Sequence, residues 1–131
     1  MDTNSKETFV IDASFMMAFL LNEKESEVKN IFFRYAANEI QLIAPVILKY
    51  EVGNSLRTQI LRKRLTQNEA RKFYLLFLKL KIEECEIDYL ETIHIALSKN
   101  ITFYDASYLN VSKRHSAKLL TLDKELLKVV S

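Results

Sequence analysis

Hydrophobic residues follow two different patterns along this chain. Short unbroken runs are typical of strands that are buried on both faces, whereas hydrophobic residues that recur every three or four positions are typical of helices with one face in the core. Such runs predict strands at residues 9–11, 40–44 and 118–122, and residues 82–87, which are rich in Glu, are a further candidate strand. The recurring pattern predicts helices at residues 15–21, 24–37, 45–64, 67–81, 89–99 and 102–114, and a short helix after residue 123.

Residues at the expected helix starts agree with these boundaries. Pro45 suits the first turn of a helix, where its missing N–H is not needed. We expect residues 129–130 to form a strand remnant and the polar residues 1–7 to form a flexible tail. Two pairs of residues have the spacing of capping boxes: Thr66 with Glu69, and Thr102 with Asp105.

The order of the predicted elements points to one class of fold. Strands that are separated by helices need crossover connections, so the expected sheet is parallel and covered by helices. One Gly and one Pro argue against an all-β fold, which needs many tight turns. The length of 131 residues suits a single domain that spans residues 1–131. The sequence therefore predicts one α/β domain with a small parallel sheet.

Charge and cysteine content narrow the class of protein further. Lys and Arg number 19 and Asp and Glu 17, so the net charge of +2 does not by itself indicate nucleic acid binding. Cys85 is the single cysteine, which excludes an intrachain disulfide and fits a reducing compartment. The chain starts without the basic and apolar regions of a signal peptide, and its longest apolar stretch, residues 15–21, is too short to span a bilayer. We expect a cytoplasmic protein with no membrane contact.

Four acidic residues stand where parallel sheets carry their functional groups. Asp12 and Asp123 directly follow the first and last predicted strands, so both are expected at the same edge of the sheet. Glu51 lies at the rim of the apolar stripe of its helix, and Asp105 lies in the first turn of another helix, near Tyr108. Carboxylates that are brought together repel one another, and a bound cation removes that repulsion.

Each acidic residue also has a purely structural explanation. Asp12, Asp105 and Asp123 could cap helices, and Glu51 could pair with a basic side chain. Together, however, the four indicate a metal site in which their carboxyl groups converge at one sheet edge within a metal's reach. All-oxygen ligation favours Mg²⁺ or Mn²⁺. The two histidines and the single cysteine form no cluster that would favour zinc. A pair of ions held by carboxylates clamps the attacking and leaving oxygens of a phosphodiester, which makes nuclease chemistry the leading hypothesis.

At these residues the sequence resembles the PIN-domain family, and within it the VapC-like toxins of toxin–antitoxin pairs. Four segments carry the resemblance in the family's order: residues 9–14 (FVIDAS), 51–56 (EVGNSL), 102–109 (TFYDASYL) and 119–126 (LLTLDKEL). The resemblance implies a three-layer α/β/α sandwich with a small central parallel sheet, Mg²⁺- or Mn²⁺-dependent endonucleolytic cleavage of RNA, a homodimer, and inhibition by a cognate antitoxin. By position it makes four residues both catalytic and metal-binding: Asp12, Glu51, Asp105 and Asp123.

The same resemblance assigns supporting roles around the acidic residues. Ser14 and Thr121 would be hydroxyls that position a water or a carboxylate, and Asn54, one helical turn from Glu51, would support the site. Two features are unlike the family: the final strand is short or missing, and Gly53 lies inside a helix, where it could allow another backbone to approach closely.

Basic and aromatic residues are the candidates for contacts with RNA. Two basic groups could neutralise phosphates, although for any one of these residues a solvated helix face is the more common explanation. Tyr104 and Tyr108 could stack on bases, or they could fill the core. The basic candidates are Arg57, Arg62, Lys113 and Arg114.

Three other classes of protein share parts of this pattern. A binding scaffold of the same fold would act by contacting protein or RNA without cleavage, with the acids only capping helices. A phosphoacceptor receiver domain needs an adjacent acidic pair after its first strand, where this chain has Asp12 alone. A histidine-pair ribonuclease needs a recognisable site, which neither His94 nor His115 offers. A metal-dependent ribonuclease is therefore the preferred hypothesis.

Overall fold

A parallel sheet of four strands forms the centre of the protein. The computed structural model describes residues 6–130. The strand order is β3-β2-β1-β4, and each neighbouring pair is parallel. The strands are β1 (Glu7–Ile11), β2 (Ile40–Pro45), β3 (Glu83–Cys85) and β4 (Lys118–Leu120). Because β2 and β4 pair with opposite sides of β1, the direction in which the sheet grows reverses at β1.

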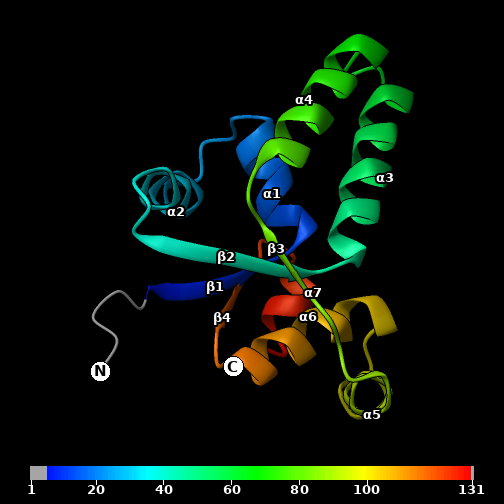
Figure 1. Ribbon diagram of the computed structural model, residues 1–131. Helices are drawn as coiled ribbons and strands as arrows, with labels where there is room; N and C mark the ends of the chain where they lie inside the picture. The colour runs from blue at the N-terminus through cyan, green and yellow to red at the C-terminus, as the bar shows by residue number, and fades with distance from the viewer. Residues whose placement is uncertain (1–5, 131) are drawn as a thin grey trace.

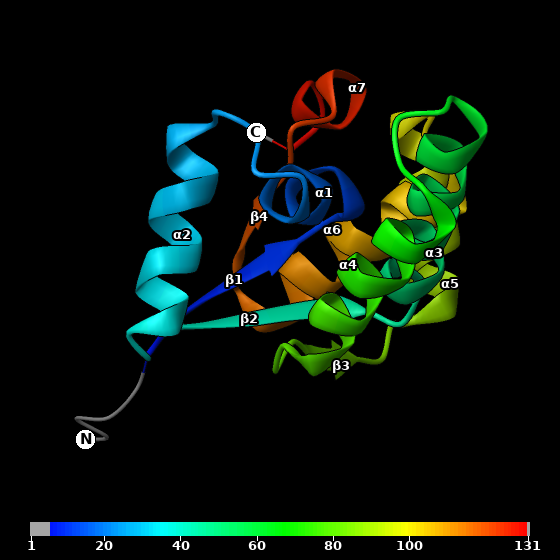
Figure 2. The same ribbon diagram turned by 90° about the horizontal axis from the view of Figure 1, so that it is seen from above.

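Helices cover both faces of this sheet (Figure 1). One layer contains α1 (Ala13–Leu20), α2 (Ser26–Ala36), α3 (Ile47–Leu61) and α4 (Gln67–Lys79). On the opposite face lie α5 (Tyr89–Lys99) and α6 (Phe103–His115), and α7 (Lys124–Leu127) follows β4. Figure 2 shows α1 near the carboxyl end of β1, with α2 to one side and the α3–α4 hairpin to the other. The expected three-layer α/β/α sandwich is confirmed.

The two inner strands form the middle of the hydrophobic core. Val10 and Ile11 of β1 and Leu42 of β2 have exposed fractions of 0%. Their side chains point to opposite faces of the sheet, yet all are buried because helices cover both faces. No helix within residues 6–130 combines the length and the hydrophobicity that crossing a bilayer would require.

Pro45 is the clearest difference between the predicted and the observed elements. It ends β2, where it pairs with Cys85, instead of opening the next helix. The helix α3 begins two residues later, at Ile47. A proline is compatible with the end of a strand, because no further N–H is needed there for the ladder.

The observed bounds of several other elements also differ from the predicted bounds. β1 begins at Glu7, so the predicted tail of residues 1–7 is too long, and residues 1–5 lie outside the described residues. Both edge strands, β3 and β4, pair over three residues and are shorter than predicted. Residues 129–130 form no strand; their side chains are partly buried against the core.

The α3–α4 hairpin is packed tightly where Gly53 faces Tyr74. A Cβ atom on residue 53 would lie 3.3 Å from Oη and 3.5 Å from Cζ of Tyr74. The Tyr74 hydroxyl donates a hydrogen bond of 2.6 Å to the carbonyl oxygen of Lys49, which holds the ring over the glycine. The close neighbour of Gly53 is thus an aromatic side chain, not the backbone that the sequence suggested.

Replacing Gly53 by leucine should destabilise the protein by about 1–3 kcal/mol, because the new side chain has to displace the Tyr74 ring. Urea denaturation followed by circular dichroism measures this loss. The matched control is Arg57→Leu at an exposed position of the same helix, which should change the free energy of unfolding by less than about 0.5 kcal/mol. Equal losses in the two variants would contradict the role given to the glycine.

Candidate active site

The pocket that gathers the acidic residues lies at the carboxyl ends of β1 and β4. Asp12 directly follows β1, and its backbone N–H donates to the carbonyl oxygen of Leu120, the last residue of β4, at 3.4 Å. Thr121 and Asp123 follow β4 on the same edge. The growth of the sheet reverses at β1, so this edge is the switch point at which open α/β sheets bind ligands.

The Asp12 carboxylate is buried and held by three donors. Its exposed fraction is 5%. Oδ1 accepts from the Ser14 hydroxyl at 2.7 Å and from the Phe15 N–H at 3.0 Å, and the Thr121 hydroxyl donates to Oδ2. The bond from Phe15 is the N-cap of α1, as the structural explanation for Asp12 supposed. Capping of α1 does not require the Ser14 and Thr121 hydroxyls. These two hydroxyls fix the direction of both carboxylate oxygens of Asp12.

Ser14 and Thr121 also hold the loop that carries Asp123. The Ser14 hydroxyl accepts from the Leu122 N–H at 2.9 Å, and the Thr121 hydroxyl accepts from the Asp123 N–H at 3.0 Å. The two supporting hydroxyls expected from the sequence are therefore brought together, and the groups that they position are a carboxylate and a loop.

Glu51 reaches the same pocket from α3. Its side chain is half-buried, and its Oε1 accepts a hydrogen bond of 2.6 Å from the Tyr108 hydroxyl. Tyr108 lies on α6 and is almost completely buried, with an exposed fraction of 1%. It therefore cannot stack on a base, which was one of the two roles that the sequence left open for it. Its pKa is raised far above the ordinary value by burial and by the neighbouring Glu51 charge, so the phenol stays protonated and donates.

Asp105 and Asp123 differ in how far helix capping explains them. The backbone N–H of Asp105 donates to the Thr102 hydroxyl at 3.0 Å, which is half of the predicted capping box. The complete box forms at Thr66, as predicted. Asp123 does cap α7: its Oδ1 accepts from the N–H groups of Glu125 at 2.8 Å and Leu126 at 3.2 Å. Capping by Asp123 is compatible with its place in the pocket wall.

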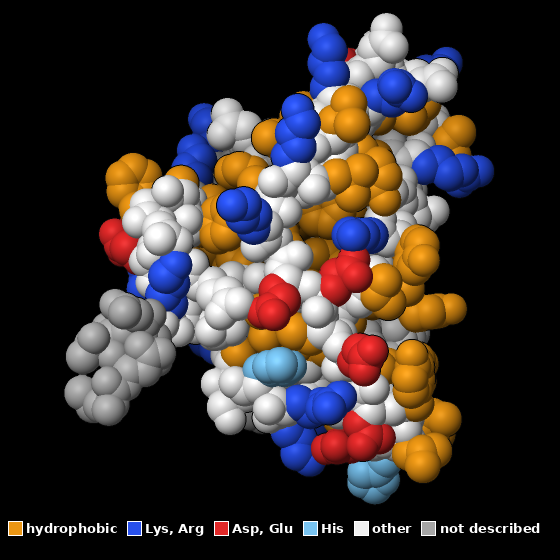
Figure 3. All heavy atoms as spheres, in the orientation of Figure 1, with side chains coloured by type: hydrophobic (Ala, Val, Ile, Leu, Met, Phe, Trp, Pro, Cys, Tyr) orange, Lys and Arg blue, Asp and Glu red, His pale blue; other side chains and the backbone are white. Residues whose placement is uncertain are grey.

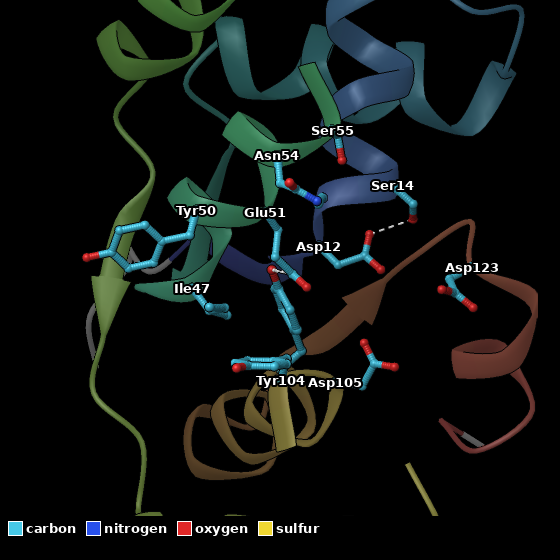
Figure 4. A pocket seen from close by; sticks show the side chains of 12 residues that line it. Asp12, Ser14, Ile47, Tyr50, Glu51, Asn54, Ser55, Tyr104, Asp105 and Asp123 are labelled. Atoms are coloured by element: carbon cyan, nitrogen blue, oxygen red, sulfur yellow. Dashed lines mark hydrogen bonds between the residues drawn. The ribbon is translucent and has the colours of Figure 1, made fainter. Parts of the chain in front are cut away.

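All four acidic residues line one open pocket of about 650 Å³. Figure 4 shows that Asp105 and Asp123 approach it from one side, whereas Tyr50 and Tyr104 stand on the other. Tyr50 was not among the sequence candidates, because an exposed aromatic residue on a helix gives no signal without its neighbours. The pocket is lined by Asp12, Ala13, Ser14, Ile47, Tyr50, Glu51, Asn54, Ser55, Tyr104, Asp105, Tyr108 and Asp123.

Burial and mutual repulsion make this pocket unfavourable for negative charge. Burial raises the pKa of Asp12, and the charge of Asp123 adds to the rise, although three hydrogen bonds oppose it. The pKa of Glu51 is raised by burial and then by the charges of Asp105, Asp12 and Asp123, against the bond from Tyr108. Burial, followed by the charges of Asp123 and Asp12, also raises the pKa of Asp105. A cation would relieve all of these effects at once.

The donor set fits a hard divalent cation that keeps much of its water. Within residues 6–130, no three His, Cys, Asp or Glu side chains lie close enough together to hold one ion in this arrangement. The expectation that the four carboxylates lie within one ion's reach is therefore not met as the side chains stand. Mg²⁺ is usually bound by one or two carboxylates and several waters, which this open acidic pocket can supply.

The four basic candidates lie outside the pocket wall. Arg57 lies on α3 and Arg62 follows its last residue, so both belong to the hairpin, where Figure 3 shows basic side chains. Lys113 pairs with Glu91 at 2.6 Å, and Arg114 donates to the Glu86 carbonyl oxygen at 3.1 Å. The last two lie in the final turn of α6, at the opposite end of the helix from Asp105.

An acidic pocket at the switch point of a small parallel sheet agrees with a match to the PIN domain family over residues 9–130. The chain belongs to this family. Over 121 residues it is 30% identical to Ribonuclease VapC3 of Pyrobaculum aerophilum, a match that covers 89% of this chain and 90% of that protein. The resemblance to VapC-like PIN-domain proteins that was expected from the sequence is confirmed.

Two crystal structures have the same fold. PAE2754 from Pyrobaculum aerophilum superposes with a TM-score of 0.74 at 24% identity, covering 94% of this chain and 84% of that one. VapC20 of Mycobacterium tuberculosis, described as a sarcin–ricin loop cleaving toxin, superposes with a TM-score of 0.61 at 12% identity, covering 92% of this chain and 93% of that one. At these identities the two likenesses establish the architecture alone.

The raised pKa of Asp105 predicts a pH-dependent change in stability. A carboxyl group whose pKa is higher in the folded than in the unfolded state destabilises the fold as the pH rises above the ordinary value of 3.8. Asp105→Asn should therefore raise the thermal midpoint at pH 7.5 in chelator by about 2–5 °C. The gain should shrink as the pH falls towards 3.8 and disappear below that value, where the wild-type carboxyl is protonated in both states.

The control for this experiment is Glu23→Gln, which removes an exposed acidic side chain outside the pocket and should leave the midpoint unchanged. A lower midpoint for Asp105→Asn than for the wild type at pH 7.5 would contradict the repulsion described for the pocket.

Proposed function

We propose that this protein is a metal-dependent endoribonuclease and the toxin of a toxin–antitoxin pair. The observation that carries the proposal is the meeting of Asp12, Glu51, Asp105 and Asp123 in one pocket, where their charges oppose one another. Simple helix capping does not explain why Glu51 and Asp105 face this pocket. The 30% identity with Ribonuclease VapC3 supports RNA as the substrate.

Carboxylate oxygens of the four acidic residues would hold Mg²⁺ or Mn²⁺. Both of these cations prefer oxygen ligands such as carboxylates. When bound, the metal supplies charge neutralisation at the scissile phosphate and activation of water. The chain's own residues prepare the site. Ser14, Thr121 and the Phe15 N–H orient Asp12, and the Tyr108 hydroxyl binds Glu51. Asn54 lines the pocket one turn from Glu51 and is placed to bind substrate or water.

Exposed aromatic side chains at the pocket support an unpaired strand as the substrate. Tyr50 is 67% exposed and Tyr104 is 57% exposed, and both line the pocket beside Ile47. Bases that are unstacked from their neighbours bind well to such rings, whereas paired bases inside a duplex cannot reach them. In this proposal the phosphate lies at the acidic side of the pocket and a neighbouring base lies on the aromatic side.

The basic candidates differ in how readily they can contact RNA phosphates. Arg57 lies further along the helix that carries Glu51, and Arg62 directly follows that helix, so both can contact phosphates of an RNA strand that leaves the pocket along the hairpin. Lys113 and Arg114 are engaged by Glu91 and the Glu86 carbonyl, so they remain weaker candidates. The cytoplasmic location expected from the sequence also stays a prediction.

The direct test is cleavage of single-stranded RNA by the purified protein. Cleavage should require Mg²⁺ or Mn²⁺ and stop in excess chelator, and it should produce internal cuts. Asp12→Asn should reduce the rate by more than about 100-fold, because it removes a charge at the metal site while asparagine still caps α1. Glu23→Gln should cleave at the wild-type rate.

Three results would contradict this function. Activity that survives the chelator would exclude the metal mechanism, and full activity of Asp12→Asn would exclude the assigned site. Expression of the wild-type protein should arrest growth unless the antitoxin is co-expressed. A folded, metal-loaded protein that binds RNA without cutting it, and whose expression is harmless, would instead be the scaffold that the sequence left as the alternative.

The family resemblance also implies a homodimer, and the outward face of α5 supports one. Tyr89 and Leu90 are 69% and 81% exposed, and Ile93 and Leu97, further along the same helix, are 49% and 79% exposed. Figure 3 shows hydrophobic side chains gathered along this edge of the molecule, over α5 and the near end of α3. These four side chains carry no charge, so they can pack against their copies across a twofold axis without repulsion.

Replacing Leu90 and Leu97 together by glutamate should shift the protein from dimer to monomer, because like charges would face each other across the twofold axis. Size-exclusion chromatography with light scattering measures the mass. The matched control is Leu75→Glu with Leu78→Glu on α4, two exposed leucines on another helix, which should leave the mass unchanged. A wild-type protein that is monomeric at micromolar concentration would refute the dimer.

The exposed leucines of α4 are the surface that we assign to the antitoxin. Leu75, Leu76 and Leu78 are 50%, 45% and 47% exposed on the hairpin. An amphipathic helix of a partner can place its own hydrophobic side chains against such a face. Basic residues near the end of the hairpin would attract an acidic segment of that partner.

A further inference from the structure

We propose that Tyr108 is a positioning residue that holds the Glu51 carboxylate in the direction needed to bind the cation. This inference rests on the proposed function, because it assigns a role within the same metal site. It concerns a residue that lies behind the acidic side chains rather than among them.

The contact between Tyr108 and Glu51 spans the two helical layers. The Tyr108 hydroxyl on α6 lies 2.6 Å from Oε1 of Glu51 on α3. These helices cover opposite faces of the sheet, so the bond passes the sheet edge at the pocket (Figures 1 and 4). Asp105 lies one turn before Tyr108 on α6. One helix thus carries both a proposed cation ligand and the group that orients another ligand.

Glu51 depends on Tyr108 more than Asp12 depends on any one of its donors. Asp12 accepts three hydrogen bonds, which use both of its oxygens. Within residues 6–130, Tyr108 is the one side chain that donates a hydrogen bond to Glu51. Glutamate also has one more rotatable bond than aspartate, so its carboxylate has more orientations to lose on binding.

The buried tyrosine ring makes this donor rigid. With an exposed fraction of 1%, the Tyr108 side chain is held by close packing although it borders the pocket, so its hydroxyl has a fixed position. Binding of that hydroxyl to Oε1 leaves Oε2 of Glu51 without a donor among the side chains of residues 6–130, on a residue that lines the pocket. A carboxylate held by one oxygen presents the other in a defined direction, which strengthens cation binding because less freedom is lost.

The test is Tyr108→Phe, which keeps the ring and removes the hydroxyl. The measurement is the dissociation constant of Mn²⁺, obtained by electron paramagnetic resonance on the free protein without RNA. We expect binding to weaken about 10–100-fold, the usual effect of losing a group that orients a metal ligand. Thermal denaturation in chelator checks that the variant is folded.

The matched control is Tyr74→Phe. Tyr74 also donates a hydrogen bond of 2.6 Å to α3, but its acceptor is the carbonyl oxygen of Lys49, outside the pocket. This variant, on α4 instead of α6, also loses a tyrosine hydroxyl that donates to α3. It should bind Mn²⁺ within about twofold of the wild type. Equal Mn²⁺ affinities in Tyr108→Phe and Tyr74→Phe would overturn the proposal.

The kinetics separate positioning from a general structural defect. Tyr108→Phe should need about 10–100-fold more Mg²⁺ for half-maximal cleavage, while the rate at saturating Mg²⁺ returns to within a few-fold of the wild-type rate. A low rate that high Mg²⁺ does not restore would mean that Tyr108 supports the fold of the site and not the direction of Glu51.

Binding of Mn²⁺ to the wild type and the two variants distinguishes failure of the metal-dependent function from failure of the role of Tyr108. A wild-type protein that binds no Mn²⁺ would overturn both the metal-dependent function and the role of Tyr108. If the wild type and Tyr74→Phe bind Mn²⁺ while Tyr108→Phe binds it equally well, the proposed function stands and the positioning role alone is refuted.

Discussion

The parallel pairing of β1 with β4 is the interaction on which the whole pocket depends. It places Asp12 beside Thr121, although 109 positions separate them in the chain. The Thr121 hydroxyl then donates to Asp12 and accepts from the Asp123 N–H at 3.0 Å. A single strand pairing therefore orients two of the four acidic residues, because parallel strands end at the same edge of their sheet.

The pocket holds negative charge where the fold alone would disfavour it. Burial and neighbouring carboxylates raise the pKa of Asp12, Glu51 and Asp105. The hydrophobic core around the inner strands supplies the stability that such a site needs. Residues that oppose stability and persist at one place are typical of functional sites, where activity and stability compete.

Local rules explain which features could be predicted from the sequence. Runs of hydrophobic residues located the inner strands, and Asp12 and Asp123 were found because they follow strand ends. Pro45 was misplaced because the first turn of a helix and the end of a strand both tolerate proline. The bond from Tyr108 to Glu51 joins residues 57 positions apart and depends on how helices on opposite faces of the sheet are placed at its edge, which no local pattern encodes.

The bond between Tyr108 and Glu51 has a consequence for the motions of the protein. It connects α3 and α6 past the edge of the sheet, so the two helical layers meet at the pocket as well as through the sheet between them. Any ligand held by Glu51 together with Asp105 would strengthen that second connection. By thermodynamic linkage, the local openings of the two layers would then become coupled to occupancy of the pocket, and amide protons in both would exchange more slowly together.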